Sequence, residues 1–391
     1  MKKEIVLLCI FVLILIIIFS KFSNNREVVN KDNKEKRAIF ISYIELAKYI
    51  KDKNIEISRK NIDEMIDNIS NLGFNMIILQ VRSSSDAIYS SKIFPWSSTI
   101  STSEGVDPGM DFLEYFINQS HQHNILLYAW INPYRVRTTS NLETISPSNP
   151  AYSYINTDYI YVNNGVYYNP SKPEVEDLIV DGVEEVVKNY DVDGILFDDY
   201  FYPSNDVDIS DYEEYISKHE FIDLKNYHLM IINKMIERVH NVCKKYHKDF
   251  GVSPDGNVDN DYNQVFADVI TWCSSDKYVD FIMPQIYYGF YNETKSYKKV
   301  IDEWDSMVTS GSVRLMLALA FYKVGTFDNY AKSGKEEWLS HDDIIMREII
   351  LGRNLKHYDG FSLFRYDYLF DSNLYTDMTI HEIENMKKVL N

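Results

Sequence analysis

Cysteine is scarce in this chain of 391 residues, and so are basic residues relative to acidic ones. The three cysteines, Cys9, Cys243 and Cys273, show no Cys-x-x-Cys or Cys/His spacing, which excludes a disulfide framework and a cysteine-based zinc site. Forty Lys and Arg stand against 58 Asp and Glu, a net charge of -18. That balance argues against binding to nucleic acid or anionic lipid, because both need clustered cations. Intrinsic disorder is also excluded for most of the chain, since 45% of the residues are apolar.

Long apolar runs are lacking except for one, residues 5–19, at the N-terminus. Lys2 and Lys3 precede this run, and no small-x-small cleavage site follows it. At about 1.5 Å per helical residue the run crosses most of a hydrocarbon core, and flanking lysines can cover the rest. We expect residues 1–23 to be a signal anchor that enters the cell membrane through residues 5–19, with a cleaved signal peptide as the alternative. Residues 24–36 then form a polar stalk, and residues 37–391 form one domain outside the membrane.

From residue 37 onward, short apolar runs alternate with segments of helical periodicity. Eight runs are predicted to be strands: residues 38–43, 76–81, 125–132, 194–199, 250–253, 281–287, 313–321 and 360–366. Eight segments are predicted to be helices: residues 58–72, 111–123, 173–189, 223–247, 262–273, 296–308, 341–355 and 380–389. Alternating strands and helices form parallel sheets, and eight such units favour an α/β fold closed into a (β/α)8 TIM barrel. A doubly wound open sheet is disfavoured, because no G-x-G-x-x-G follows the first strand.

Polar residues gather at six of the predicted strand ends, where a TIM barrel places its chemistry. The fourth strand ends in Phe197-Asp198-Asp199-Tyr200. Because side chains alternate along a strand, Asp198 faces the barrel mouth if Leu196 packs inward, and Asp199 then faces a neighbouring loop or helix end. A carboxyl group at a barrel mouth is a candidate nucleophile, charge stabiliser or acid/base. The alternative is that both aspartates only bind loop amides.

Hydrolysis of a glycosidic bond usually requires a second carboxyl group near the first. Asp255, Asp86 and Asp367 are the candidates at other strand ends. Asp255 lies one strand from Asp198 and follows a proline, although it also fits a turn before Gly256. Asp86 fits ligand binding better than catalysis, and Asp367 is the weakest of the three. The catalytic candidates are therefore Asp198, Asp199 and Asp255.

Aromatic residues are frequent on the predicted βα loops, where little hydrophobic core is expected. Sugar sites are lined with aromatic rings because sugars have apolar faces. Trp130, Tyr200 and Tyr287 lie at or just after strand ends. The segment after the third strand adds six tyrosines: Tyr152, Tyr154, Tyr159, Tyr161, Tyr167 and Tyr168. This density favours an extended carbohydrate cleft.

Six blocks, in order along residues 36–370, resemble the glycosyl-hydrolase-like ten family: residues 73–86, 93–97, 107–109, 129–135, 192–203 and 284–287. Bacterial envelope proteins of that family have a (β/α)8 barrel, and some members cleave peptidoglycan glycan strands that lack stem peptides. The resemblance implies a cleft lined by Arg82, Asp86, Asn132, Arg135, Asp198, Asp199, Gln285 and Tyr287. Family members more often have an apolar or aromatic residue where this chain has Asp255. The fourth strand also resembles the chitinase pattern D-G-x-D-x-D-x-E, but Leu196 and Tyr200 replace two of its acids.

Three other classes of protein compete with a glycosidase. A metal-dependent deacetylase would need ligands, but His121 and His123 end a predicted helix leading into the third strand, on the rim opposite the βα loops. A Ser or Cys nucleophile is disfavoured because G-x-S-x-G is absent. A non-catalytic glycan-binding barrel would keep the aromatic and basic residues without needing Asp198.

We therefore expect a membrane-anchored, extracytoplasmic glycoside hydrolase acting on a cell-envelope polysaccharide, with peptidoglycan glycan strands as substrate. The expected partners are the polysaccharide and the membrane, with no nucleic acid. No cofactor and no metal are required by this chemistry. The glycan-binding barrel and the deacetylase remain as alternatives.

Overall fold

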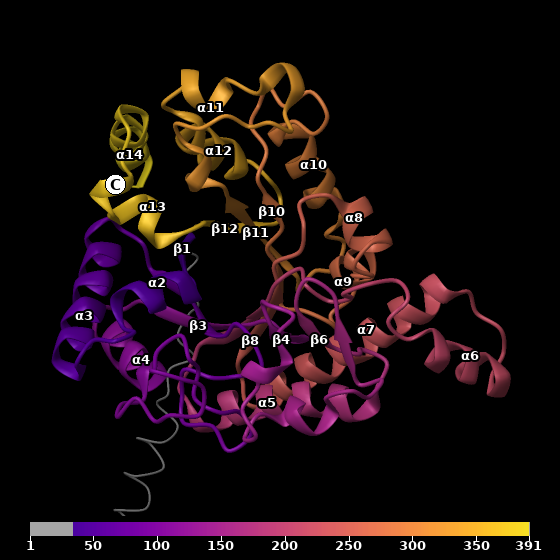
Figure 1. The fold of residues 1–391 in the computed structure, drawn as a ribbon. Helices are drawn as coiled ribbons and strands as arrows, with labels where there is room; N and C mark the ends of the chain where they lie inside the picture. The colour runs from indigo at the N-terminus through magenta and orange to yellow at the C-terminus, as the bar shows by residue number, and fades with distance from the viewer. Residues whose placement is uncertain (1–33, 391) are drawn as a thin grey trace, which may run out of the picture. The chain divides into compact units, whose positions relative to one another are not determined.

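Eight parallel strand positions form a closed barrel in the structure, a computed structural model that describes residues 34–390 (Figure 1). The hydrogen-bonded order is β10-β11-β12-β1-β2-β3-β7-β8-β9, and pairing of β9 with β11 closes the ring. β9 and β10 are two halves of the sixth strand position. The bounds are β1 Lys36–Ile41, β2 Met76–Arg82, β3 Leu126–Ile131, β7 Gly194–Phe197, β8 Asp249–Val252, β9 Phe281–Ile282, β10 Gln285–Ile286, β11 Arg314–Leu319 and β12 Tyr358–Leu363. The predicted (β/α)8 barrel and its eight strands are confirmed.

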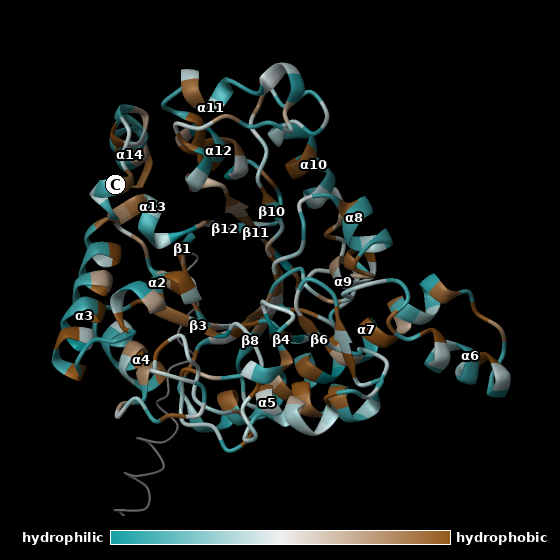
Figure 2. Cartoon of the chain, in the orientation of Figure 1, coloured by the Kyte–Doolittle hydropathy of each residue, from teal (hydrophilic) through white to brown (hydrophobic). Residues whose placement is uncertain are grey.

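Helices surround the barrel, and seven of the eight predicted ones are present. They are α3 Ile55–Asn71, α4 Phe112–Gln122, α5 Pro173–Asn189, α7 Leu224–Lys245, α10 Tyr297–Met307, α12 Ile344–Gly352 and α14 Asp377–Leu390. Figure 2 shows both hydrophobic and hydrophilic residues along these helices, as expected for helices with one face on the barrel. The helix predicted at residues 262–273 is wrong as a single element, because it is split into α8 (Val258–Asn263) and α9 (Val269–Ser274). Phe266 between them has φ +54°, and Asp268 caps the second helix by accepting from the Thr271 amide.

Several short elements were not predicted. They are the helices α2 Tyr43–Tyr49, α6 Ile209–Lys218, α11 Glu337–Ser340 and α13 Tyr366–Phe370, and the 3-10 turns η1 Leu142–Thr144, η2 Pro150–Tyr154, η3 Phe321–Lys323, η4 Lys332–Gly334 and η5 Ser372–Leu374. α2 begins directly after β1 because Ser42 and Glu45 form a capping box, in which Glu45 accepts from the Ser42 amide at 2.9 Å. The segment after β3 forms a small antiparallel sheet of β4 (Arg135–Arg137), β5 (Ile160–Val162) and β6 (Val166–Tyr168).

Two layers of apolar side chains stabilise the barrel. Alternate strand residues fill its interior, where Phe40, Ile78, Trp130, Leu196 and Met316 belong to one cluster. The residues between them point outward and pack on the helices. This alternation follows from strand geometry, in which successive side chains point to opposite faces. Burial of these side chains, at about 25 cal/mol per Å² of apolar surface, is the main contribution to the stability of the barrel.

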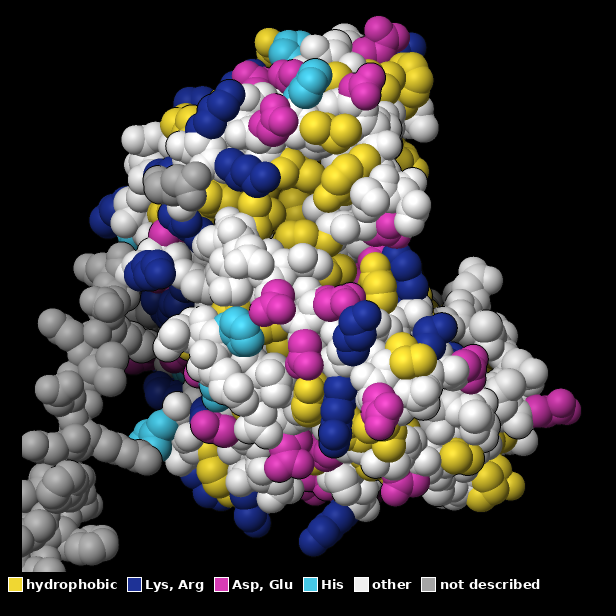
Figure 3. Space-filling model, turned by 90° about the vertical axis from the view of Figure 1, so that its left-hand side faces the viewer, with side chains coloured by type: hydrophobic (Ala, Val, Ile, Leu, Met, Phe, Trp, Pro, Cys, Tyr) yellow, Lys and Arg dark blue, Asp and Glu magenta, His cyan; other side chains and the backbone are white. Residues whose placement is uncertain are grey.

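No helix within residues 34–390 has the length and apolar character needed to cross a membrane. The expected anchor, residues 1–23 with the apolar run 5–19, lies outside the described residues, as does most of the expected stalk. β1 begins at Lys36, one residue before the expected start of the barrel. Figure 3 shows the side of the barrel where α3 and α14 lie, with acidic and basic side chains interspersed. The surplus of acid therefore forms no single patch on this face.

Candidate functional site

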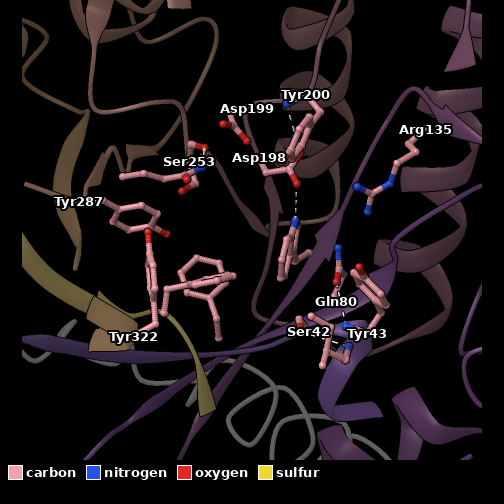
Figure 4. A pocket seen from close by; sticks show the side chains of 15 residues that line it. Ser42, Tyr43, Gln80, Arg135, Asp198, Asp199, Tyr200, Ser253, Tyr287 and Tyr322 are labelled. Carbon is pink, nitrogen blue, oxygen red and sulfur yellow. Dashed lines mark hydrogen bonds between the residues drawn. The ribbon is translucent and has the colours of Figure 1, made fainter. Parts of the chain in front are cut away.

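A cavity of about 330 Å³ opens where the barrel strands end (Figure 4). Its walls come from every strand position of the barrel, because residues at or just after each carboxyl end contribute. The lining residues are Phe40, Ser42, Tyr43, Ile44, Gln80, Trp130, Arg135, Asp198, Asp199, Tyr200, Ser253, Gln285, Tyr287, Tyr322 and Phe364. This is the end of a TIM barrel at which active sites form.

Asp198 is buried at the mouth of the barrel, two residues after the inward-facing Leu196, as strand alternation predicts. Its Oδ2 accepts a hydrogen bond from the Trp130 indole N–H at 3.1 Å and another from the Asn132 amide group. Burial raises the pKa of Asp198 to about 6, while the nearby Arg135 and these donors oppose that rise. The carboxyl group is therefore held in one orientation and is mostly ionised at neutral pH.

A chain of hydrogen bonds fixes the Asn132 amide behind Asp198. The Gln80 side chain accepts from the Tyr43 backbone N–H at 2.9 Å and donates to the Asn132 Oδ1 at 2.6 Å. Arg135 donates to the same oxygen at 3.3 Å. Because the Asn132 oxygen is occupied by donors, its NH2 group is the end that faces Asp198.

Asp199 also lines the cavity, so the expectation that it faces a neighbouring loop or helix end does not hold. The physical reason is that β7 ends at Phe197, and the alternation of a strand no longer applies two residues later. Burial is the larger cause, and repulsion by the Asp198 carboxylate the next, of a rise in the pKa of Asp199 to about 7. A hydrogen bond from Gln285 opposes this rise. The two neighbouring carboxyl groups thus occupy different environments.

A second cavity, of about 470 Å³, adjoins the first, since Asp199, Gln285 and Tyr287 line both. The rest of its lining comes from the loops after β8, β10 and β11. Those residues are Asp255, Asn257, Asn260, Tyr288, Asn292, Thr294, Lys295, Lys323, Asp328 and Tyr330. The two cavities together extend along the rim, on either side of Asp199.

Asp255 lies in the second cavity and not beside Asp198 in the first. Its carboxylate accepts from the Asn257 backbone N–H at 2.9 Å and from the Asn260 side chain at 3.0 Å, next to the start of α8. This is the turn role that the sequence left open for it. Asp367, the weakest candidate, binds Lys48 at 2.9 Å and lines neither cavity.

Two residues expected in the cleft lie elsewhere. The register of β2 shifts between Gln80 and Arg82, so Gln80 faces the mouth and the Arg82 side chain enters the layer outside the barrel, over the Phe94 ring at 4.0 Å. Arg82 is 2% exposed and lines neither cavity. Asp86 is buried away from both cavities as well, and burial raises its pKa to about 6. A direct contact of either residue with substrate has no support in this geometry.

Of the remaining substrate-binding candidates, Asn132 is 2% exposed and lies behind Asp198 without lining either cavity, and the others meet at the first cavity. Trp130, Arg135, Tyr200, Gln285 and Tyr287 all line it. Arg135 donates to the Ser83 carbonyl at 2.7 Å and lies over the Tyr200 ring at 5.6 Å. Tyr200 is 54% exposed, which leaves a ring face open to a ligand.

The tyrosine-rich segment after β3 does not form the cleft, since none of its six tyrosines lines either cavity. Three of them, Tyr161, Tyr167 and Tyr168, lie in strands of the sheet β4-β6-β5. Tyr154 and Tyr159 pack against the hydrophobic core, and Tyr152 is 48% exposed. Tyr154 and Tyr159 stack at 4.6 Å between ring centroids, and the buried Tyr168 hydroxyl is 2.7 Å from the Ser85 hydroxyl. The density of tyrosine thus reflects a small local core that the sequence did not reveal.

The structure also shows residues that were not among the candidates. Gln80, Ser253, Tyr43 and Tyr322 line the first cavity. Gln80 and Ser253 lie at predicted strand ends, so their position was a usable signal. Tyr43 and Tyr322 follow strand ends in α2 and η3, short elements that carried no clear periodicity.

The histidines at the end of α4 lie away from the cavities. His121 is 3.0 Å from Asp193, which precedes β7 and also accepts from the backbone of Leu127 in β3. This places the pair at the amino ends of the strands, opposite the mouth, as expected. Within residues 34–390 no group of three or more His, Cys, Asp or Glu is arranged to hold a metal ion.

Known proteins resemble this chain in sequence and in fold. The family model Glycosyl hydrolase-like 10 matches residues 35–336. Glycosyl hydrolase YngK of Bacillus subtilis (strain 168) is 30% identical over 355 residues, covering 84% of this chain and 68% of the relative. Glycosyl hydrolase DigH of Escherichia coli (strain K12) is 29% identical over 341 residues, covering 80% of this chain and 76% of the relative.

Among solved structures, the glycoside hydrolase domain of PgaB (BpsB) from Bordetella bronchiseptica superimposes with a TM-score of 0.57 at 12% identity. The match covers 92% of this chain and 99% of that domain, and at this identity it supports the fold alone. The family match rests on sequence over most of the barrel and includes the strands that carry Asp198, Asp199 and Gln285. The chain therefore belongs to the Glycosyl hydrolase-like 10 family and is a glycan-acting hydrolase.

Proposed function

We propose that this protein is an extracytoplasmic glycosidase that cleaves O-glycosidic bonds in a cell-envelope polysaccharide, with peptidoglycan glycan strands as its substrate. The N-terminal residues 1–23 would tether the barrel to the membrane. The family resemblance supports the substrate, and the apolar run at residues 5–19 supports the tether.

The observation that carries the proposal is the pair Asp198 and Asp199 at the barrel mouth. Glycoside hydrolysis needs one carboxyl group that donates a proton to the leaving oxygen and one negative charge facing the positive charge that develops on the sugar. Asp198 is bound by Trp130 and Asn132 and lies near Arg135, which favours its ionised form. The pKa of Asp199 is higher, about 7, so this group keeps a proton to donate near neutral pH.

Asp199, rather than Asp255, is therefore the partner of Asp198 in this proposal. The Asp199 side chain lies where the two cavities meet, so a proton donor there can reach the bond between two bound sugars. The Asp255 carboxylate is occupied, because it accepts hydrogen bonds from the Asn257 backbone N–H and the Asn260 side chain. A group that already accepts from two donors is poorly placed to hold a proton for the leaving oxygen.

The other side chains of the first cavity suit a sugar. Trp130 and Tyr200 offer aromatic surface, while the Arg135 guanidinium offers N–H groups beyond those that bind Ser83 and Asn132. The combination of apolar rings and a polar donor matches the two kinds of surface on a pyranose.

The test is incubation of the full chain with purified glycan strands, followed by assay of new reducing ends. Wild type is expected to release them, and Asp198→Asn is expected to release almost none. Asp302→Asn, an exposed aspartate on α10, serves as the matched control and is expected to behave as wild type. Full activity in Asp198→Asn would refute the assignment. Binding of several glycans without cleavage would favour the glycan-binding barrel, and metal-dependent acetate release would favour the deacetylase.

A further inference from the structure

The second cavity contains hydrogen-bond donors that have no partner among residues 34–390. Lys295 lines it, just before α10, and its ammonium group makes no ion pair or hydrogen bond with a described residue. Asn292 is 5% exposed, and its Oδ1 accepts from the Thr294 and Lys295 backbone N–H groups at 3.0 Å each. The Asn292 NH2 group is therefore left for a ligand. These two donors suit a ligand with acceptor groups.

The other charged residues of the second cavity are Lys323 and three aspartates, Asp199, Asp255 and Asp328, and each has a partner. Asp199 accepts a hydrogen bond from the Gln285 side chain. Lys323 binds Asp328 at 2.8 Å and donates to the Tyr287 carbonyl at 2.7 Å. Asp255 accepts from two donors near the start of α8. Lys295 is thus the cation of this cavity that lacks a counter-ion within the described residues, and a bound anion would supply one.

Tyr330 adds a flat apolar surface to the same cavity. Its side chain is 89% exposed, although large aromatic side chains are usually at least partly covered. An exposed ring beside hydrogen-bond donors is the arrangement with which proteins hold the face of a pyranose. The cavity therefore offers an aromatic surface and a free cation to one ligand.

We propose that the second cavity binds the sugar on the far side of the scissile bond, and that this sugar carries a carboxylate, which pairs with Lys295 while Tyr330 stacks on the ring. This inference rests on the proposed function, because it takes the first cavity as the site of the neighbouring sugar. Glycan strands of peptidoglycan fit it chemically, since every second sugar bears a lactyl ether whose carboxylate is free when no peptide is attached. Lys295 is then a specificity-determining residue that recognises strands with that free carboxylate.

The test compares native glycan strands with strands whose carboxyl groups have been reduced to alcohols, using the full chain. Wild type is expected to prefer native strands by about tenfold in kcat/KM, the range of one hydrogen bond to a charged group. Lys295→Gln should lose that preference through a higher KM on native strands, with reduced strands cleaved as by wild type. Lys295→Arg should restore part of the preference. Lys299→Gln, an exposed lysine of α10 outside the cavity, is the matched control and should keep it.

Each outcome separates this inference from the proposed function. If wild type cleaves neither kind of strand, the proposed function fails. If it cleaves both equally well, or if Lys295→Gln lowers both rates by the same factor, only the role of Lys295 is overturned. Tyr330→Ala should raise KM on both substrates alike, and an unchanged KM would overturn the stacking contact.

Discussion

The hydrogen bond from Asn132 to Asp198 controls the pH dependence expected of this enzyme. Replacing Asn132 with leucine keeps a side chain of similar size and removes the donor to the Asp198 Oδ2. A hydrogen bond to a charged buried group contributes about 1.5–3 kcal/mol, and about 1.4 kcal/mol corresponds to one pH unit. Loss of this donor disfavours the ionised form, so the pKa of Asp198 should rise by about one to two pH units above its value of about 6.

The direction of the effect on activity follows from the roles of the two carboxyl groups. Asp198 must be ionised, so activity falls below a pH of about 6, and Asp199 must be protonated, so activity falls above a pH of about 7. Because the two carboxyl groups interact, these two pH limits describe the titration of the pair and not of either residue alone. In Asn132→Leu the pH below which activity falls should rise toward the pH above which activity falls. The plot of activity against pH should therefore become narrower, and its maximum should be lower.

The assay is kcat/KM for strand cleavage across the acid and neutral range, with a thermal unfolding curve to show that the variant is folded. Trp130→Phe removes the other donor, which lies 3.1 Å from the same oxygen, and should move the acid limb in the same direction. If either variant loses activity by one factor at every pH, with the acid limb in its original place, the reasoning is refuted.

Three further predictions follow from individual contacts. Asp199→Asn should lower strand cleavage by about 100- to 10,000-fold but affect an aryl glycoside far less, because a phenolate leaves without a proton; equal losses on both would contradict the acid role. Asp255→Ala should leave kcat close to wild type and lower the free energy of unfolding by about 1 kcal/mol, since its carboxylate accepts from Asn257 and Asn260; a loss of kcat as large as that of Asp198→Asn would point to Asp255 as the partner. Gly182→Ala should lower the free energy of unfolding by about 1–3 kcal/mol in a urea titration, because the new Cβ would lie 2.2 Å from the Arg82 guanidinium and 2.7 Å from the Phe94 ring; unchanged stability would show that Arg82 can move aside.

The barrel was predictable because its strands are short apolar runs, separated by amphipathic helices. Asp198 was predictable as well, since alternation from Leu196 fixes the side to which it points. Asp199 was placed wrongly because no pattern marks the end of β7 at Phe197. The sequence also gives no sign of the register shift between Gln80 and Arg82, which depends on pairing with β3, a strand far along the chain.

Other parts of the site depend on folding of loops that have no periodicity of their own. The tyrosines after β3 look like ligand contacts in the sequence, yet most of them lie in or near a three-stranded sheet whose strands have only three residues each. The break between α8 and α9 depends on Phe266 at φ +54°, a conformation that a phenylalanine rarely adopts. Lys295 and Tyr330 line one cavity only because the loops after β10 and β11 lie on one rim.

The central claim is that Asp198 and Asp199 carry out hydrolysis of a glycosidic bond in glycan strands. The most direct measurement is cleavage of purified strands in water enriched in heavy oxygen, with the products examined by mass spectrometry. We predict that each new reducing end contains one heavy oxygen atom with wild type, and that such ends are nearly absent with Asp198→Asn. Cleavage by Asp198→Asn at the wild-type rate, or wild-type products without heavy oxygen, would contradict the account.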